Sequence, residues 1–121
     1  GVELGLSRRT FAQLTAPASE PSGGLRDRVL DAEVRYSLGF SKPSPMVVFG
    51  SGPDAFGAPG MGGSFGFADS RRRIGFGYAM NRLGYDLFVD PRAAALQEAV
   101  YRCVRRIEAR EAVPVAGAAV P

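Results

Sequence analysis

Segments in which apolar residues alternate with polar or small ones predict strands, because a period of two places every second side chain on one face of a sheet. The clearest two segments, 63–68 and 74–80, are joined by the polar turn 69–73, and this order predicts a β-hairpin. A third alternating segment covers 33–41, and a short apolar run at 46–49 predicts one more strand. The pattern therefore predicts about four strands.

The first strand of the expected hairpin has two very different faces. Phe65 and Phe67 share one face, and the opposite face carries only Ser64, Gly66 and Ala68. A strand face without large side chains is typical of a place that another backbone approaches closely. We therefore expect another part of the structure to pack against this small face.

Two helices are predicted by helical spacing and by their capping residues. The first covers 7–16 and begins at Ser7, whose hydroxyl can accept a hydrogen bond from an unpaired backbone N–H. The second covers 90–109, where Asp90 can cap the helix and Pro91 suits its first position. Its apolar residues form one stripe, as in a helix that packs on a core.

The order of helix, strands, hairpin and long helix predicts an α+β fold. We expect an antiparallel sheet of about four strands, with a short N-terminal helix and a long C-terminal helix. A single helix layer would leave one face of this sheet bare. The chain is therefore expected to form half of a layered domain rather than a complete one.

Charge and hydropathy narrow the classes of function. The 121 residues carry a formal net charge of +3, but the basic residues are scattered in short groups at 8–9, 71–73 and 105–106. A nucleic-acid surface needs a contiguous basic patch, often with aromatic side chains for stacking, so we expect no nucleic-acid partner. A small basic nucleic-acid binder stays open as a weaker alternative, with a steep salt dependence of binding as its signature. No run of about 18 apolar residues occurs, so no membrane-spanning helix is expected.

Several kinds of catalytic site are excluded by residues that the sequence lacks. It has no histidine, and Cys103 is its only cysteine. A Cys–His pair or a Ser–His–Asp triad therefore cannot form within these residues. The same holds for an intrachain disulfide and for a zinc site built on histidine and cysteine. We expect neither a metal nor another cofactor, and we interpret Cys103 as buried filler in the long helix.

A glycine-rich segment leads into the hairpin, with glycines at 57, 60, 62 and 63. Such a segment lets backbone N–H groups come close to a ligand. It is not a phosphate-binding loop of the G-x-x-x-x-G-K-[ST] kind, since the pattern differs and a strand follows in place of a helix. The alternative without a ligand is a bulged entry to the strand.

The segment 56–82, which reads FGAPGMGGSFGFADSRRRIGFGYAMNR, resembles the C-terminal end of the serine β-lactamase-like hydrolases. This family includes class C β-lactamases, DD-peptidases and related esterases, and many of the esterases read F-G-H-x-G-x-G-G-S-x-G-F-A-D, then G-x-G-F-x-Y-x-M-N-R, then D-P-R. The segments 90–92 (DPR), 99–101 (AVY) and 36–40 (YSLGF) also fit. The resemblance implies that residues 1–112 are the C-terminal portion of a β-lactamase-like domain. The tail at 113–121, rich in Pro, Ala and Val and without periodicity, is expected to be irregular.

The resemblance also implies that the catalytic machinery lies elsewhere. In this family a nucleophilic serine belongs to an S-x-x-K motif on a helix, and a tyrosine motif supplies a general base; both lie upstream of the matched region. The sequence contains no S-x-x-K motif, and Lys42 is its only lysine. We therefore expect no catalytic residue in this chain and no activity from the chain alone.

A third motif of the family, which has Lys or His, any residue and then Gly, falls on Ala58, Pro59 and Gly60. The resemblance places Gly60 and Met61 on the oxyanion and substrate wall, where the Met61 backbone N–H would stabilise negative charge. Ala58 makes the motif degenerate, because it replaces the polar side chain that normally hydrogen-bonds into the site. Pro59 has no N–H to donate.

Two functions follow from these expectations. In the first, the chain is the C-terminal segment of a β-lactamase-like serine hydrolase of the esterase or amidase type. In the second, it is a catalytically inactive remnant that serves as a structural subunit in a larger assembly. In both, the expected partner is the missing part of the domain or another protein chain that covers the sheet.

Overall fold

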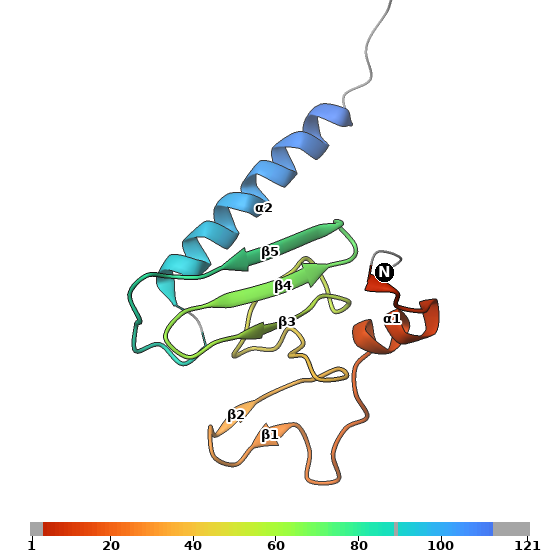
Figure 1. The fold of residues 1–121 in the computed structure, drawn as a ribbon, viewed down its shortest axis with the longest axis vertical. Helices are drawn as coiled ribbons and strands as arrows, with labels where there is room; N and C mark the ends of the chain where they lie inside the picture. Colours follow the sequence, from red (N-terminus) through yellow and green to blue (C-terminus); the bar gives the residue numbers. More distant parts are fainter. Residues whose placement is uncertain (1–3, 89, 113–121) are drawn as a thin grey trace, which may run out of the picture.

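A computed structural model describes residues 4–88 and 90–112, and within them it has two helices and five strands (Figure 1). The elements follow one another as α1 (Arg8–Thr15), β1 (Arg26–Asp27), β2 (Ala32–Glu33), β3 (Phe56–Pro59), β4 (Phe65–Asp69), β5 (Ile74–Tyr78) and α2 (Pro91–Glu111). The strands form two antiparallel sheets, β1–β2 and β3–β4–β5. The predicted α+β class, with its short first helix and long last helix, is confirmed.

Both helices begin at the predicted capping residue. The Ser7 hydroxyl accepts a hydrogen bond from the Thr10 N–H at 3.0 Å. The Asp90 carboxylate accepts one from the Arg92 N–H at 2.8 Å, and Pro91 occupies the first helical position. These contacts satisfy backbone donors that have no partner inside the helix.

The three-stranded sheet contains the predicted hairpin, with β4 in the centre and β3 and β5 at its sides. Side chains at alternate positions of β4 lie on opposite faces. Phe65 and Phe67 therefore share an inner face, and Phe67 stacks on Phe76 of β5 with ring centroids 5.2 Å apart. Ala58, Gly66 and Gly77 are paired across the three strands on the other face.

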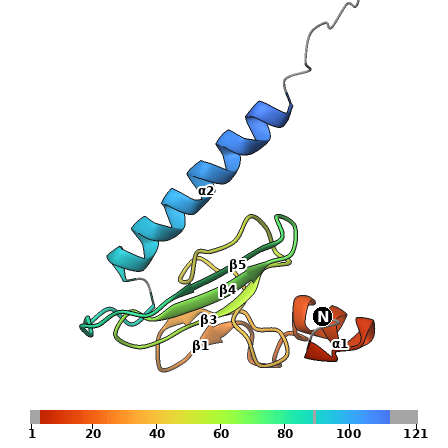
Figure 2. The ribbon, with the colours of Figure 1, turned by 45° about the horizontal axis from the view of Figure 1, so that its top comes forward.

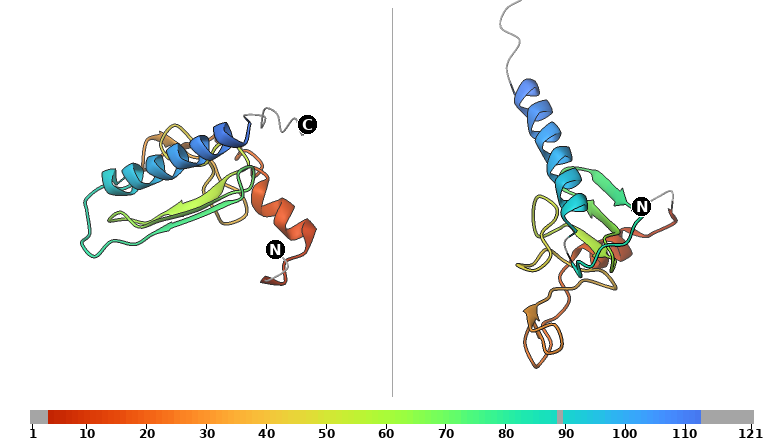
Figure 3. Two further views of the ribbon diagram at one scale, coloured as in Figure 1. Left: turned by 90° about the horizontal axis from the view of Figure 1, so that it is seen from above. Right: turned by 90° about the vertical axis from the view of Figure 1, so that its left-hand side faces the viewer.

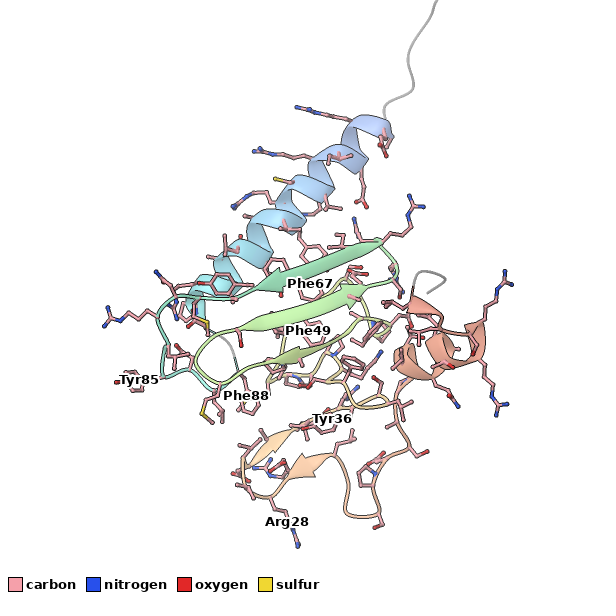
Figure 4. The ribbon with its side chains drawn as sticks, viewed as in Figure 1. Arg28, Tyr36, Phe49, Phe67, Tyr85 and Phe88 are labelled. Atoms are coloured by element: carbon pink, nitrogen blue, oxygen red, sulfur yellow. The ribbon has the colours of Figure 1, made fainter. Side chains whose placement is uncertain are left out.

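Helix α2 covers the inner face of this sheet (Figure 3), and its last turns extend beyond the sheet (Figures 1 and 2). Tyr101 of α2 stacks on Phe67 at 6.2 Å, and Phe67 is only 6 % exposed. Figure 4 shows Phe49 beside Phe67 at the sheet. The buried apolar core around these rings consists of Val47, Phe49, Ala55 and Phe67.

A buried carboxylate ties three segments together at the far end of β4. Asp69, which is 1 % exposed, accepts hydrogen bonds from the Ser51 N–H and the Tyr101 hydroxyl, both at 2.7 Å, and from the Arg72 N–H at 3.2 Å. Burial alone would raise the pKa of Asp69, but these hydrogen bonds outweigh it and lower the pKa. The same burial and the carboxylate raise the pKa of Tyr101.

Two of the expected strands are wrong. Of the range 33–41 only Glu33 belongs to a strand, β2, and the chain then turns back, with the Ser37 N–H bonded to the Phe40 carbonyl at 2.8 Å and Gly39 at φ 79°. The run 46–49 is irregular as well, because Ser44 and Val47 bond each other's backbone. Burial of Val47 and Phe49 explains the apolar pattern without a strand.

The glycine-rich segment that leads into the hairpin begins with strand β3 at Phe56–Pro59, a strand that the sequence pattern did not predict. It pairs with β4 because Gly57 allows the two backbones to approach; an added Cβ there would lie 2.6 Å from the Cβ of Phe67. The predicted irregular tail, 113–121, lies outside the described residues. Neither described helix is long and apolar enough to cross a bilayer.

Candidate functional site

The face of the three-stranded sheet that α2 does not cover is lined by small residues. We define this outer face as Ala58, Gly66, Ala68, Gly75 and Gly77, which share it by their strand pairing. Among the described residues, a Cβ added at Gly75 or Gly77 would meet no atom within 4 Å, and one at Gly66 would meet only the Phe76 carbonyl oxygen, at 3.7 Å. An open groove along this face runs between Ala58 and Tyr78. Contacts within the described residues therefore do not explain why these positions are so small.

A tight turn, Gly60–Ser64, joins β3 to β4 at the end of this groove. The Gly60 N–H bonds the Ser64 carbonyl at 2.7 Å, and the Gly63 N–H bonds the Gly60 carbonyl at 3.1 Å. Gly62 and Gly63 have φ angles of 90° and 114°, which residues with a Cβ rarely adopt. The sequence folds locally in this way because it supplies glycine at both positions.

Of the predicted site residues, Ala58 and Gly60 line the groove, and Met61 lies next to Gly60 on the turn. Ala58 is exposed on β3, Gly60 follows the strand, and Met61 is 77 % exposed on the turn. Within the described part of the chain, the Met61 N–H donates to no backbone carbonyl. Their roles on an oxyanion wall stay predictions, but a backbone donor is available there.

A buried acid lies directly behind this turn. Asp90, which is 4 % exposed, contacts the positions that a Cβ would occupy on Gly63 and on Gly84. The Arg92 guanidinium binds it through Nε at 2.9 Å and Nη2 at 2.6 Å. The hydrogen bonds from Arg92 lower the pKa of Asp90 to about 2, so this group is ionised at neutral pH. From the sequence, Asp90 was predicted only as a helix cap; glycines at 63 and 84 were the signal of a close approach.

The described residues offer backbone donors but no side-chain nucleophile with an adjacent base. Lys42 is buried, and its Nζ donates to the Thr15 carbonyl at the end of α1. Burial lowers the pKa of Lys42, which the nearby Asp54 partly offsets. Cys103 is exposed on α2, contrary to the expected burial. Among residues 4–88 and 90–112, no group of three or more His, Cys, Asp or Glu could hold a metal ion.

Comparison with solved structures finds chains that are similar to this one. The chain is similar to the crystal structure of a family VIII carboxylesterase, with 42 % sequence identity over 81 % of this chain and a TM-score of 0.70. It spans only 25 % of the length of that protein. No family model and no curated protein sequence matches the chain. The predicted resemblance to the C-terminal part of the β-lactamase-like hydrolases is confirmed, and the chain corresponds to part of such a domain.

Proposed function

We propose that this chain, which is the C-terminal part of a β-lactamase-like hydrolase, supplies the oxyanion wall of a serine esterase site. The observation that carries the proposal is the Gly60–Ser64 turn, whose exposed Met61 presents an unused backbone N–H beside an open groove. The identity of 42 % to a carboxylesterase supports an ester as the substrate.

In the proposed reaction, a serine hydroxyl from the part of the domain outside these residues attacks the ester carbonyl. A base on that part accepts the hydroxyl proton, and the carbonyl oxygen becomes an oxyanion that accepts a hydrogen bond from the Met61 N–H. The C–O bond to the alcohol then breaks, the alcohol leaves with the proton, and water hydrolyses the acyl-serine. A single backbone donor of this kind contributes about 3–4 kcal/mol of transition-state stabilisation.

We further propose that residues 1–112 form the C-terminal portion of the domain, and that its remaining part covers the outer face. Gly75 and Gly77 have open space beside them, so a helix or another backbone could lie very close to the sheet there. The covering part belongs either to the same polypeptide or to another protein chain. In either case it would place its serine near the groove lined by Ala58 and Gly60, beside the turn that carries Met61.

Ala58 supports the second function, a catalytically inactive structural subunit. Its methyl group can donate no hydrogen bond into the groove, where the family pattern places a polar residue. If this loss has only weakened an enzyme, Ala58→His in the complete protein should raise the rate of ester hydrolysis. An unchanged, undetectable rate would support the structural subunit.

The test is covalent labelling of the full-length protein with a fluorophosphonate probe. We expect labelling of a serine outside residues 1–121, with a rate that falls about 100-fold or more in Met61→Pro, which lacks the backbone donor. Met61→Ala is the matched control, because it keeps the N–H and should label at nearly the rate of the wild type.

Circular dichroism must show that both variants are folded. Failure of the folded wild type to label, under conditions in which a related esterase labels, would overturn the catalytic proposal. Equal labelling of folded Met61→Pro and Met61→Ala would overturn the assignment of Met61 while leaving the esterase function in place.

A further inference from the structure

We propose that Asp90 and Arg92 are positioning residues that fix the orientation of the Gly60–Met61 peptide. This inference deepens the proposed function and rests on it only for its catalytic consequence. The two residues lie at the start of α2, about thirty positions after the turn in the sequence, and they contact it from behind.

The first step links Asp90 to the turn. Its Oδ2 atom lies against Gly63, where even a Cβ would collide with the carboxylate, and only glycine fits there. Gly63 also has a φ of 114°, so the position is restricted both by the backbone and by the acid. A carboxylate that is 4 % exposed and held by two nitrogens of Arg92 forms a rigid support for this residue.

The second step links Gly63 to the peptide that carries the proposed donor. The Gly63 N–H donates to the Gly60 carbonyl at 3.1 Å. That carbonyl belongs to the same planar peptide unit as the Met61 N–H, and in a trans peptide the two groups point in opposite directions. No cis peptide bond occurs among the described residues. Holding the carbonyl toward Gly63 therefore aims the Met61 N–H away from the turn.

The third step adds a second connection, through the loop after β5. Nη1 of Arg92 donates to the Arg82 carbonyl at 2.8 Å. Two residues on, the Gly84 N–H donates to the Gly62 carbonyl, also at 2.8 Å. The Leu83 side chain lies against Gly62, with its Cδ2 2.8 Å from where a Cβ would be. Arg92 thus holds the loop that in turn holds the middle of the Gly60–Ser64 turn.

These contacts distinguish Asp90 from an ordinary helix cap. One oxygen, Oδ1, caps α2 by accepting from the Arg92 N–H at 2.8 Å. The other oxygen faces Gly63 and Gly84, which a cap alone would not require. Asparagine is as good a cap as aspartate, so Asp90→Asn keeps the helix start and removes the charged pair with Arg92.

The experiment uses the full-length protein with a p-nitrophenyl ester and compares Asp90→Asn, Arg92→Ala and Arg92→Lys with the wild type. We expect kcat to fall about 10- to 100-fold in Asp90→Asn and Arg92→Ala, with KM changed less than threefold, because a misplaced oxyanion donor acts on the transition state. Arg92→Lys should recover part of the loss. Arg72→Ala, which breaks the exposed pair with Glu108 near the other end of α2, should leave kcat unchanged.

A second readout does not depend on activity. Hydrogen exchange of the amides of Gly60 and Gly63, which both donate hydrogen bonds within the turn, should be at least tenfold faster in Asp90→Asn than in the wild type, with exchange in α2 unchanged. If the wild type is inactive but exchange in the turn responds in this way, the positioning role stands and the proposed function fails. If folded Asp90→Asn and Arg92→Ala keep wild-type exchange in the turn and wild-type kcat, the inference is overturned.

Discussion

Contacts within this chain explain the side chains on one face of the β3–β4–β5 sheet, but they do not explain the small residues on the other face. On the inner face, Phe65, Phe67 and Phe76 pack against one another and against α2 and Phe49. On the outer face, Gly75 and Gly77 have open space where a side chain could stand. Phe56 at one corner is the exception, since it meets Phe11 and Phe40 edge to face.

The difference separates glycines that the chain itself requires from glycines that it does not. Gly57 and Gly63 cannot be replaced without a clash with Phe67 or Asp90. Gly75 and Gly77 could be replaced by larger residues without a clash if the domain consisted only of the described residues. Their small size is therefore best explained by a part of the domain outside this chain, which also agrees with a match to only a quarter of a carboxylesterase.

The largest expected effect comes from removing a buried aromatic side chain from the inner face. Phe67→Ala should lower the free energy of unfolding by about 3–5 kcal/mol, because it removes a buried ring and leaves a cavity. Denaturant unfolding followed by circular dichroism measures this. Ala68→Gly, one position along on the outer face, is the control and should cost about 1 kcal/mol; equal losses for both variants would remove the contrast between the faces.

Next comes the hydrogen bond that anchors α2 to the end of the sheet. Tyr101→Phe leaves the buried Asp69 carboxylate without its hydroxyl donor, and we expect a loss of about 1.5–3 kcal/mol in the free energy of unfolding. In the wild type, the raised pKa of Tyr101 gives a contribution that is complete below about pH 10 and is lost as the pH rises further. Alkaline unfolding of Tyr101→Phe should lack this loss, and the same alkaline profile in both proteins would contradict it.

A substitution on the outer face should act only where the rest of the domain is present. Gly77→Leu should leave the unfolding free energy of the 121-residue chain unchanged or slightly raised, since no atom of residues 4–88 and 90–112 lies within 4 Å of a Cβ at this position. In the full-length protein the same change should cost about 1–3 kcal/mol by overpacking. Thermal unfolding of the wild type and Gly77→Leu, each as the 121-residue chain and as the full-length protein, decides this. If Gly77→Leu does not lower the stability of the full-length protein, the outer face is not covered.

The smallest effect concerns acid pH. The pKa of Asp90 is lowered to about 2, against about 3.9 in an unfolded chain. Its contribution to stability is therefore present above about pH 4 and is lost as the pH falls toward 2. Acid unfolding of Asp90→Asn should show a shallower loss over this window than the wild type, and parallel curves would refute the pairing with Arg92.

The sequence predicted the elements whose signals are local. Ser7 and Asp90 mark helix starts by their own side chains, and alternation around the turn 69–73 marks the hairpin. The expected strand at 33–41 failed because Tyr36 and Leu38 are exposed and a turn reverses the chain. The alternation of apolar residues in 33–41 therefore does not correspond to a buried strand face.

For the site, the resemblance predicted roles for Ala58, Gly60 and Met61, which stay predictions; in the structure Ala58 and Gly60 line a groove, with Met61 next to them on the turn. The sequence could not show that Asp90 and Arg92 support the turn, because this contact joins residues that are far apart in the sequence. Only the fold brings the start of α2 against Gly63. The glycines at 62, 63 and 84 indicate a close approach, but not which residue approaches.

The most direct test of the account is the accessibility of the outer face in the full-length protein. Ala79, exposed just after β5 and bordering the same groove, can be changed to Cys in a Cys103→Ser background with little change in volume. We expect the Ala79→Cys thiol to react with a maleimide at least 100-fold more slowly in the full-length protein than in the 121-residue chain. Equal, rapid reaction in both folded proteins would contradict the claim that another part of the domain covers this face.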